Sequence, residues 1–473
     1  MWRFFERIGA QGVTLIVSIV LARLLDPVVY GTVALVTVFT SILQVFVDSG
    51  LGNALIQKKD ADDLDFSSVF YCNILVCLVL YAIMFFAAPL IAKFYDMPEL
   101  TAVIRVLSLT LVISGVKNVQ QAYVSRNMLF KRFFFATIGG TIGAGAVGVW
   151  MAYRGYGVWA LVAQNLFNLL VDTVILWITV KWRPILKFSF TRLKTLFSYG
   201  WKLLASSLID NVYNNLRQLI IGKMYSSQEL AFYNKGKQFP DLLIKNVNTS
   251  IDSVLLPAMS SEQEHRDKVK TMTRRSIRTS SYIMAPLMLG LACVAESFIM
   301  VILGEKWLPC VPFLRVICIS YLFQPIHTAN LNAIKALGRS DLFLKMDIIK
   351  RAIGVICLLC TMWFGVMAMV YSFLLTDVLC QIVNTWPNRK LLNYRYADQL
   401  KDILPPILLA GVMGVVVYGV GLIDMGGFTL FVQVALGVII YIGGSVLLRL
   451  DSYKYIIDMM KKVFKKNKNT AKN

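Results

Sequence analysis

A long internal duplication of apolar segments constrains this sequence more than any other feature. The segment "IVLARLLDPVVYG" at Ile19–Gly31 has a counterpart about 200 residues later, "QLIIGKMYSSQELAFY" at Gln218–Tyr233. Two further pairs follow in the same order: "VIRVLSLT" at Val103–Thr110 with "FLRVICIS" at Phe313–Ser320, and "YGVWALVAQNL" at Tyr156–Leu166 with "FGVMAMVYSFL" at Phe364–Leu374. Repeats of membrane-spanning segments indicate a transporter whose substrate site lies between the repeats.

The composition is that of a polytopic membrane protein. Of the 473 residues, 57% are hydrophobic and 16% are charged. Apolar runs of about 20 residues, long enough to cross about 30 Å of hydrocarbon, recur along the whole chain. We predict fourteen spans, in chain order: 3–24, 28–49, 67–92, 100–123, 133–153, 157–180, 195–221, 228–257, 279–303, 309–335, 342–363, 365–387, 402–422 and 427–449.

Lysine and arginine residues in alternate loops predict the orientation of these spans. The rich loops carry Lys58, Lys59, Arg126, Lys131, Arg132, Lys181, Arg183, Lys187, Arg192, Lys194, Arg266, Lys268, Lys270, Arg274, Arg275, Arg278, Lys335, Arg339, Lys345, Arg389, Lys390, Arg395 and Lys401. Since positive loops stay inside, we expect both termini to be cytoplasmic. Spans one to six form the first half of the repeat, and spans seven to twelve form the second. Because six is an even number, both halves have the same orientation, and we expect them to be related by an axis along the membrane normal.

The predicted fold is therefore all-α, a polytopic membrane protein of about fourteen transmembrane helices. We expect an N-lobe at 1–187, a C-lobe at 188–392, two further spans within 393–450, and a basic amphipathic tail at 451–473. The tail is expected to lie on the anionic inner leaflet. No cleavable signal peptide is evident, because the first apolar run leads directly into a second span.

Several function classes are disfavoured by the composition. The net charge of +21 does not indicate nucleic-acid binding, because most of the cations lie in loops that set topology. The eight cysteines, Cys357 and Cys360 included, lie mostly in apolar spans and are expected to serve packing. With two histidines we expect no metal site. No G-x-x-x-x-G-K-[ST] loop is present, so ATP hydrolysis is not expected.

Polar residues within the spans follow single helical faces in both halves. Ionisable groups within a membrane cost at least about 2.5 kcal/mol each, so they normally face a bundle interior or water. The faces consist of Arg7, Gln11, Thr14 and Ser18; Thr37, Ser41, Gln44 and Asp48; Ser206, Asp210, Tyr213 and Arg217; and Lys237, Asp241, Ile244, Lys245, Asn248 and Asp252. Such faces, repeated in both halves, predict a central hydrated cavity.

Two interpretations of these charges stay open. They neutralise one another, as Lys237–Asp241 and Asp241–Lys245 would at i,i+4 spacing, or they bind a ligand. The first interpretation explains Arg7, Lys117, Arg217 and Lys235 less well, because no acidic residue of similar depth in the membrane lies at helical spacing from them. Amides beside cations suit a ligand with phosphate oxygens and sugar hydroxyls. Pro240 and Pro325 are expected to kink helices, and the glycines of 139–145 to serve close helix packing.

Three segments carry a resemblance to a known family. They are "FFERIGAQGVTLIVSIVLARLLDPVVYGTVAL" at Phe4–Leu35, "DSGLGNALIQKKD" at Asp48–Asp60 and "LGRSDLFLKMDIIKR" at Leu337–Arg351. They resemble bacterial polysaccharide-biosynthesis flippases of the multidrug/oligosaccharidyl-lipid/polysaccharide exporter superfamily, in the colanic and teichuronic acid branch. The resemblance implies a non-enzymatic flippase that moves undecaprenyl-diphosphate-linked oligosaccharide from the inner to the outer leaflet of the bacterial plasma membrane. It implies membrane lipids, a polysaccharide polymerase and glycosyltransferases as partners.

On that hypothesis, the polar faces bind the head group of the lipid-linked sugar. The expected cationic contacts are Arg7, Arg217, Lys235, Lys237 and Lys245, with Lys117 secondary, and the expected sugar contacts are Gln11, Gln121, Asn211, Asn214 and Asn248. The candidates for carrying a coupled proton or sodium ion are Asp48, Asp210, Asp241 and Asp252, with Asp172 and Asp377 as further acids that the sequence does not rank.

Two rival functions remain. A cation-coupled multidrug exporter of the same superfamily would need an acidic or aromatic cavity, whereas the polar faces here are basic. A membrane-embedded glycosyltransferase or O-antigen polymerase would need a large outward loop, and every outward loop is short.

Overall fold

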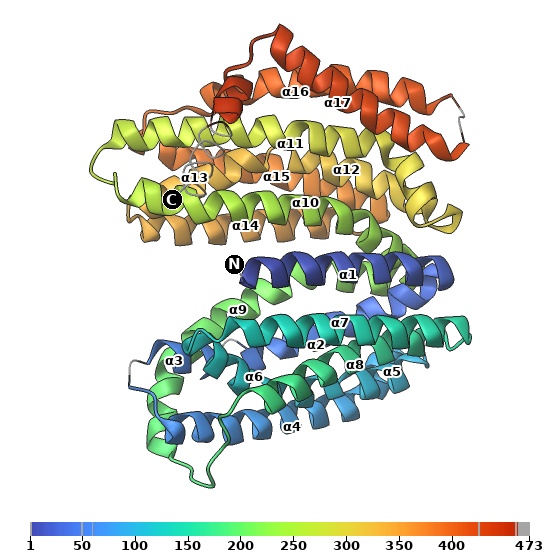
Figure 1. The fold of residues 1–473 in the computed structure, drawn as a ribbon, viewed down its shortest axis with the longest axis vertical. Coiled ribbons are helices and arrows are strands. Elements are labelled where there is room, and N and C mark those ends of the chain that lie inside the picture. Colours follow the sequence, from blue (N-terminus) through green and yellow to red (C-terminus); the bar gives the residue numbers. More distant parts are fainter. Residues whose placement is uncertain (1, 49–50, 59, 424–425, 459–460, 462–473) are drawn as a thin grey trace, which may run out of the picture. The chain divides into compact units, whose positions relative to one another are not determined.

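The computed structural model describes residues 2–48, 51–58, 60–423, 426–458 and 461, without the side chains of 2–8, 53, 130–133, 135 and 199. Within this part the chain consists of α-helices, two short 3-10 helices and no strand, which confirms the all-α prediction. It divides into two compact units, Met1–Ala231 and Phe232–Asn473, shown in Figure 1. The boundary falls inside α10.

The helix bounds follow the predicted spans closely. The helices that begin in unit 1 are α1 Trp2–Leu24, α2 Pro27–Asp48, α3 Leu51–Gln57, α4 Asp63–Phe94, α5 Leu100–Leu107, α6 Leu109–Arg126, α7 Phe130–Tyr153, α8 Val158–Thr179, α9 Phe190–Met224 and α10 Ser227–Ser260. Those of unit 2 are α11 Arg266–Ile302, η1 Glu305–Cys310, α12 Val311–Tyr321, α13 Gln324–Ala336, α14 Ser340–Thr361, α15 Val366–Leu391, α16 Tyr396–Gly421, η2 Gly426–Phe428 and α17 Thr429–Leu447.

Each of the fourteen predicted spans coincides with one helix or with consecutive helices. By length and hydropathy, 8 helices in the described residues qualify as membrane spans, or 9 if one bent pair is counted. Among the predicted spans that do not qualify are α9 and α10, whose sequences are rich in polar residues. The total of fourteen crossings therefore stays a prediction. The lobe limits also stay a prediction: the repeat places the start of the C-lobe at 188, whereas α9, which begins after 188, packs within unit 1.

The predicted kink at Pro325 is confirmed. Residues Glu305–Tyr321 and Gln324–Ala336 form two helical segments bent by 42° at the break between them. Pro325 occupies the first turn of α13, where its missing N–H leaves no intrahelical hydrogen bond unmade. The break thus comes from the covalent structure of proline. Pro240 lies inside α10, which continues through it.

The glycines of α7 serve helix packing, as predicted. A Cβ atom added at Gly145 would lie 2.5 Å from Val17 of α1, and one at Gly143 would lie 2.9 Å from Phe167 of α8. Both distances are too short for a side chain. The missing side chains therefore let α7 lie against α1 and α8, which run alongside it in unit 1.

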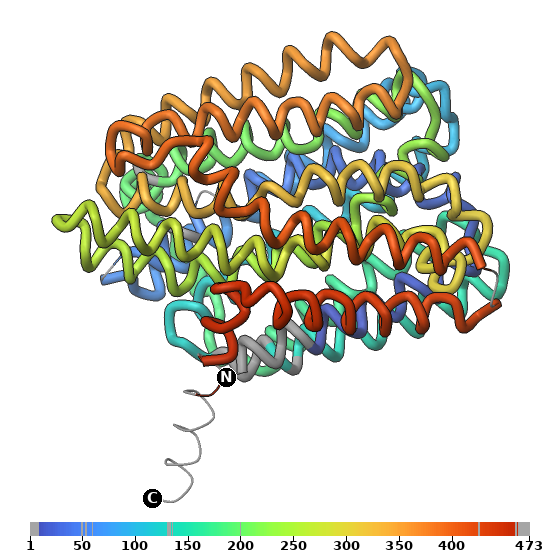
Figure 2. The backbone as a smooth tube through the Cα atoms, turned by 90° about the horizontal axis from the view of Figure 1, so that it is seen from above, coloured from blue at the N-terminus to red at the C-terminus, as the bar shows by residue number. Residues whose placement is uncertain are grey.

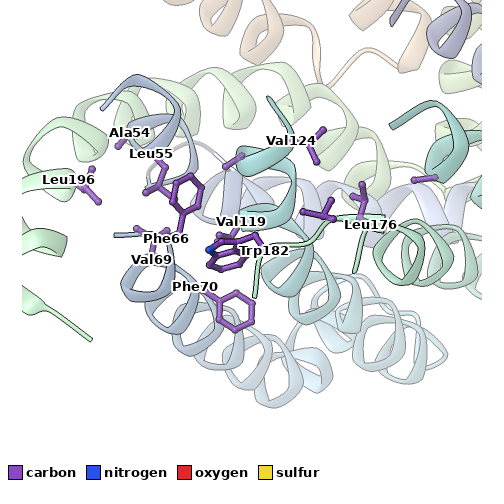
Figure 3. Close-up of a cluster of buried hydrophobic side chains, with 13 residues drawn as sticks. Ala54, Leu55, Phe66, Val69, Phe70, Val119, Val124, Leu176, Trp182 and Leu196 are labelled. Carbon is purple, nitrogen blue, oxygen red and sulfur yellow. The ribbon is translucent and has the colours of Figure 1, made fainter. Parts of the chain in front are cut away.

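An aromatic cluster packs around the first turns of α4 in unit 1. Trp182, in the connection after α8, is 5% exposed and lies 5.7 Å, between ring centroids, from Phe66 of α4. Phe70, one turn further along α4, lies 6.2 Å from the same indole. Figure 3 shows these rings together with Leu55 of α3. The cluster holds the short helix α3 and the loop 180–189 against α4.

Unit 2 is organised around the long helix α11. Helices α12, α13, α16 and α17 pack against α11, and α16 and α17 run side by side (Figure 1 and Figure 2). Tyr282 of α11 joins α17 through two hydrogen bonds: its hydroxyl donates to Ser445 Oγ at 2.9 Å, and its carbonyl accepts from the Tyr441 hydroxyl at 2.8 Å. The last two predicted spans are therefore an integral part of unit 2.

Candidate functional site

In unit 1, the predicted polar face of α2 meets a row of amides on α9 that lies beside the predicted face of Ser206, Asp210, Tyr213 and Arg217. Ser41 of α2 donates a hydrogen bond to Asn211 Oδ1 of α9 at 3.4 Å. Asn215 donates to the same oxygen at 2.8 Å, and Gln218 donates to Asn215 Oδ1 at 3.1 Å. Asn214, on the neighbouring face, is exposed. The result is a continuous row of amides along α9, a type of surface that hydrogen-bonds well to hydroxyl groups.

Lys117 of α6 is engaged by an acidic residue from another helix. Its Nζ lies 2.7 Å from Asp172 Oδ2 of α8, and the two side chains are only 14% and 15% exposed. The other carboxylate oxygen, Asp172 Oδ1, is buried and makes no hydrogen bond within the described part of the chain. The sequence search for helical-spacing partners missed this pair, because the two residues are 55 positions apart.

Asp48 belongs to a second polar group, beside Lys117. Its Oδ1 accepts hydrogen bonds from Gln44 and from Asn118 of α6, both at 3.1 Å. A Cβ atom at Gly52 of α3 would lie 2.6 Å from Asn118 Oδ1, so a glycine is needed where α3 meets this group. Asn118 follows Lys117 directly, so α6 connects the predicted ion-coupling acid Asp48 to the Lys117–Asp172 pair.

The other predicted residues of unit 1 have these positions. The Arg7 side chain lies outside the described residues, and Gln11 is half-buried in α1. Gln121 is half-buried in α6. Asp210 and Arg217 are half-buried in α9, and each has interacting partners.

In unit 2, both predicted acidic residues of α10 are bound by neutral side chains. Asp241 Oδ1 accepts from the Tyr321 hydroxyl of α12 at 2.5 Å. Asp252 Oδ1 accepts from Asn332 Nδ2 of α13 at 2.6 Å. Asp241 is held by Tyr321, and no ion pair between Asp241 and Lys245 is found within the described residues. These two bonds attach α10 to both halves of the bent span α12–α13.

The predicted cations of α10 differ in accessibility. Lys235 is 5% exposed, donates to Gln238 Oε1 at 3.1 Å and lies 5.6 Å from the centre of the Trp307 ring. Lys237 is half-buried, 5.9 Å from the Phe373 ring. Lys245 is exposed, and Asn248 is half-buried. Burial makes Lys235 the least accessible of these residues to a ligand.

The sequence analysis missed a buried amide cluster in unit 2. Asn388 of α15 donates to Asn330 Oδ1 of α13 at 2.6 Å, and Asn330 donates to Gln399 Oε1 of α16 at 2.7 Å. All three side chains are fully buried. The available signal was the spacing of Gln381, Asn384, Thr385 and Asn388, which places them on one face of α15. The cluster ties α13, α15 and α16 together.

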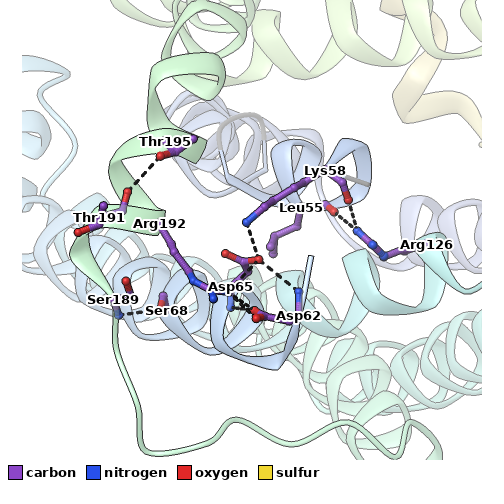
Figure 4. A network of polar contacts seen from close by, with 10 residues as sticks. All are labelled: Leu55, Lys58, Asp62, Asp65, Ser68, Arg126, Ser189, Thr191, Arg192 and Thr195. Carbon is purple, nitrogen blue, oxygen red and sulfur yellow. Dashed lines mark hydrogen bonds and ion pairs between the residues drawn. The ribbon is translucent and has the colours of Figure 1, made fainter. Parts of the chain in front are cut away.

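Leu55 and Lys58, from the segment 48–60 that carries part of the family resemblance, take part in a polar network at the start of α4, shown in Figure 4. Lys58 Nζ lies 2.6 Å from Asp65 Oδ2, and Asp65 forms a capping box with Asp62. Arg192, at the start of α9, donates to Asp62 at 2.5 Å. This guanidinium contact lowers the pKa of Asp62 to about 2. Arg126 of α6 donates to the Leu55 and Lys58 carbonyls. Leu55 and Lys58 are thus held to α4 and α6, and Arg192 attaches α9 to the start of α4.

Comparison with known proteins identifies relatives over most of the chain. A family model described as polysaccharide biosynthesis protein matches residues 20–312. The chain is 24% identical over 389 residues to the teichuronic acid biosynthesis protein TuaB of Bacillus subtilis, which covers 81% of this chain and 80% of that protein. It is 22% identical over 436 residues to the lipopolysaccharide biosynthesis protein WzxC of Escherichia coli, with coverage of 90% and 87%.

Solved structures with the same fold are also found. The lipid II flippase MurJ in its inward closed conformation superimposes with a TM-score of 0.76 at 14% identity, over 95% of this chain and 98% of that one. An inward-facing multidrug resistance transporter of the MATE family gives a TM-score of 0.62 at 13% identity, over 82% and 94%. At these identities the likeness concerns the fold alone.

Proposed function

The chain belongs to the polysaccharide biosynthesis protein family, and from this membership we propose that it is a flippase for the export of a cell-surface polysaccharide. The observation that carries the proposal is the family match over residues 20–312, which covers unit 1 from residue 20 onward and about the first third of unit 2. The chain is a membrane transport protein and not an enzyme, in keeping with relatives and structural neighbours that are transport proteins.

The proposed substrate is an oligosaccharide linked to undecaprenyl diphosphate. Its polyprenyl tail can stay in lipid, so the protein has to shield only the diphosphate and the sugar from hydrocarbon. The amide row of α9 supports this proposal, because Asn211, Asn215 and Gln218 carry donors and acceptors that suit sugar hydroxyls. The cations Arg217, Lys237 and Lys245 are the proposed diphosphate contacts, together with Arg7.

The two remaining cations become weaker candidates. Lys117 is neutralised by Asp172 at 2.7 Å, and Lys235 is almost fully buried. A diphosphate would have to displace Asp172 from Lys117 at an electrostatic cost. Gln11, Gln121, Asn214 and Asn248 stay in the proposal as sugar contacts.

The proposed direction of transport is from the inner to the outer leaflet of the bacterial plasma membrane, by alternating access of the two repeats, with both termini cytoplasmic. No bond is made or broken. A coupled proton or sodium ion is the proposed driving force, carried by Asp48, Asp210, Asp241 or Asp252. A polysaccharide polymerase and glycosyltransferases are the proposed partners in the pathway.

The test is export by Arg217→Ala and Lys237→Ala variants in a host that lacks its own flippase. At matched protein levels we expect both variants to reduce polymer export and to leave lipid-linked oligosaccharide in the inner leaflet. Lys187→Ala, a charge removal at an exposed loop position, is the matched control and should export normally. Normal export by both test variants removes these residues from the mechanism. A change in drug susceptibility without any effect on polymer supports the multidrug exporter instead.

A further inference from the structure

A small cationic cavity lies between the start of α11 and the segment that follows α17. Its volume is about 300 Å³, at the lower end of the range for ligand sites. Three arginines of consecutive turns of α11 line it, together with hydroxyl groups from both segments: Arg274, Arg275, Arg278, Thr279, Ser452 and Tyr455. All of these residues belong to unit 2, and none takes part in the proposed substrate site.

Two of the arginines are held rigidly by a buried carboxylate. Arg274 binds both oxygens of Asp402 with its Nε and Nη2 atoms, at 2.8 and 2.9 Å. Arg278 binds Asp402 Oδ1 with Nε and Nη2, at 2.8 and 2.6 Å. The Tyr394 hydroxyl completes the group with a hydrogen bond of 2.6 Å to Asp402 Oδ2. Because their inner N–H groups are used in this way, the two guanidinium groups have fixed positions at the cavity wall.

The outer side of each arginine remains accessible. Arg274 is 50% exposed and Arg278 is 36% exposed. Arg275 stacks over the Tyr455 ring at 4.4 Å and is also exposed. The three guanidinium groups have two carboxylates close to them. Asp402 forms ion pairs with Arg274 and Arg278, and Asp451 lines the cavity and lies 3.7 Å from Arg278. Cations therefore outnumber carboxylates among the side chains that line the cavity, while Asp398 attracts Arg274 from outside it.

The cavity also lies where α11 leaves the apolar part of the molecule. With 37 residues, α11 is about 55 Å long, well beyond the thickness of the hydrocarbon layer of about 30 Å. Tyr282, one turn after Arg278, is joined to Ser445 at the end of α17. Next to this junction, the apolar side chains of Leu447 and Leu448 are 83% and 59% exposed. Exposed apolar residues thus adjoin a cationic cavity, as a phospholipid with its chains and its phosphate requires.

We propose that this cavity binds the phosphate of an anionic phospholipid such as phosphatidylglycerol. The phosphate oxygens accept hydrogen bonds from the outer N–H groups of Arg274, Arg275 and Arg278 and from Ser452, while the acyl chains lie along Leu447 and Leu448. Asp402 positions Arg274 and Arg278 by accepting hydrogen bonds from their inner N–H groups. The bound lipid ties the segment after α17 to α11, so it stabilises the packing of α16 and α17 in unit 2.

The test is native mass spectrometry of the full chain in detergent, titrated with phosphatidylglycerol, phosphatidylcholine or glycerol 3-phosphate. We expect the wild type to bind phosphatidylglycerol in preference to phosphatidylcholine. Arg275→Gln should weaken that binding about tenfold, which corresponds to about 1.4 kcal/mol, because Arg275 contacts the phosphate without holding Asp402. Ser452→Ala should weaken it by a smaller factor. Arg266→Gln removes an exposed arginine from the same helix outside the cavity and should bind like the wild type.

Any one of three results overturns the proposal. The first is that Arg275→Gln and Ser452→Ala both bind phosphatidylglycerol like the wild type. The second is that phosphatidylcholine binds as well as phosphatidylglycerol, and the third is that glycerol 3-phosphate competes at the same concentrations as the lipid. The last result identifies a site for soluble phosphate esters. If Arg275→Gln does not fold, Ser452→Ala against Arg266→Gln decides the question. None of these outcomes depends on transport, so the proposal stands or fails separately from the proposed function.

Discussion

The ion pair between Lys117 and Asp172 gives the sharpest prediction about unit 1. Replacing Lys117 with Met removes the cation and keeps a side chain of similar length, so the carboxylate of Asp172 stays behind among packed helices. Asp172 Oδ2 loses its partner at 2.7 Å, and Asp172 Oδ1 has no hydrogen bond in the described residues to compensate. We therefore expect a large loss of stability from a substitution that does not create a cavity.

The magnitude follows from the burial of the pair. Breaking a buried ion pair by removing one partner costs about 3–5 kcal/mol, because an uncompensated charge remains. Both side chains are less than one sixth exposed, so solvent screening reduces this value little. Replacing both partners with apolar residues of similar volume is often nearly neutral. The double variant Lys117→Met/Asp172→Leu is therefore expected to recover most of the loss.

The assay is a double-mutant cycle on unfolding free energy, measured by denaturant titration in detergent, with polymer export measured on the same four proteins. If Lys117 serves the structure only, the double variant regains both stability and export. If Lys117 also contacts the diphosphate, or Asp172 also carries a coupled ion, the double variant is stable but exports poorly. The reasoning is refuted if Lys117→Met is as stable as the wild type, or if the double variant is no more stable than Lys117→Met alone.

Two further predictions concern unit 1. Gly31→Ala should destabilise the protein by about 1–3 kcal/mol and lower the yield of folded protein, because a Cβ atom there would lie 1.7 Å from the Ser227 carbonyl oxygen. Gly12→Ala is the control, because a Cβ atom at Gly12 would have nothing within 4 Å. Equal yields of the two variants in size-exclusion chromatography would contradict the close contact at Gly31. Asp62→Asn should destabilise the protein at pH 7. Since Arg192 lowers the pKa of Asp62 from 3.8 to about 2, the stabilising contribution is present above about pH 4 and is lost as the pH falls toward 2. The difference in unfolding midpoint between Asp62→Asn and the wild type should therefore shrink over that range, and a constant difference would exclude the ion pair as its cause.

The helices were predictable because membrane insertion imposes a strong local rule. A run of about 20 apolar residues has few alternatives to a helix in hydrocarbon, since all backbone hydrogen bonds must be made within the segment. The break at Pro325 follows from a second local rule, because proline disfavours the helical conformation of the residue before it and so favours a helix that restarts at the proline. The insertion rule could not count the crossings firmly at α9 and α10, where polar residues lower the hydropathy below that of a typical span.

The partners of the polar residues were much less predictable. Helical spacing reveals contacts within one helix, but Lys117 meets Asp172 from another helix, and Asp252 meets Asn332, 80 residues away. The buried cluster of Asn330, Asn388 and Gln399 joins three helices in the same manner. Such contacts depend on the rotation of each helix about its axis, which packing sets and which a single sequence does not contain.

These partners change the order in which the proposed substrate residues should be tested. A side chain that recognises a head group has to exchange its partners when the substrate arrives and leaves. Lys117 already satisfies its charge with Asp172, and Lys235 is buried against Gln238 and the Trp307 ring, so a ligand pays a desolvation or displacement cost at both. Lys245 of α10 and Asn214 of α9 are exposed and require no such exchange. The accessible residues are therefore expected to govern substrate affinity, while the engaged ones govern the stability of each unit.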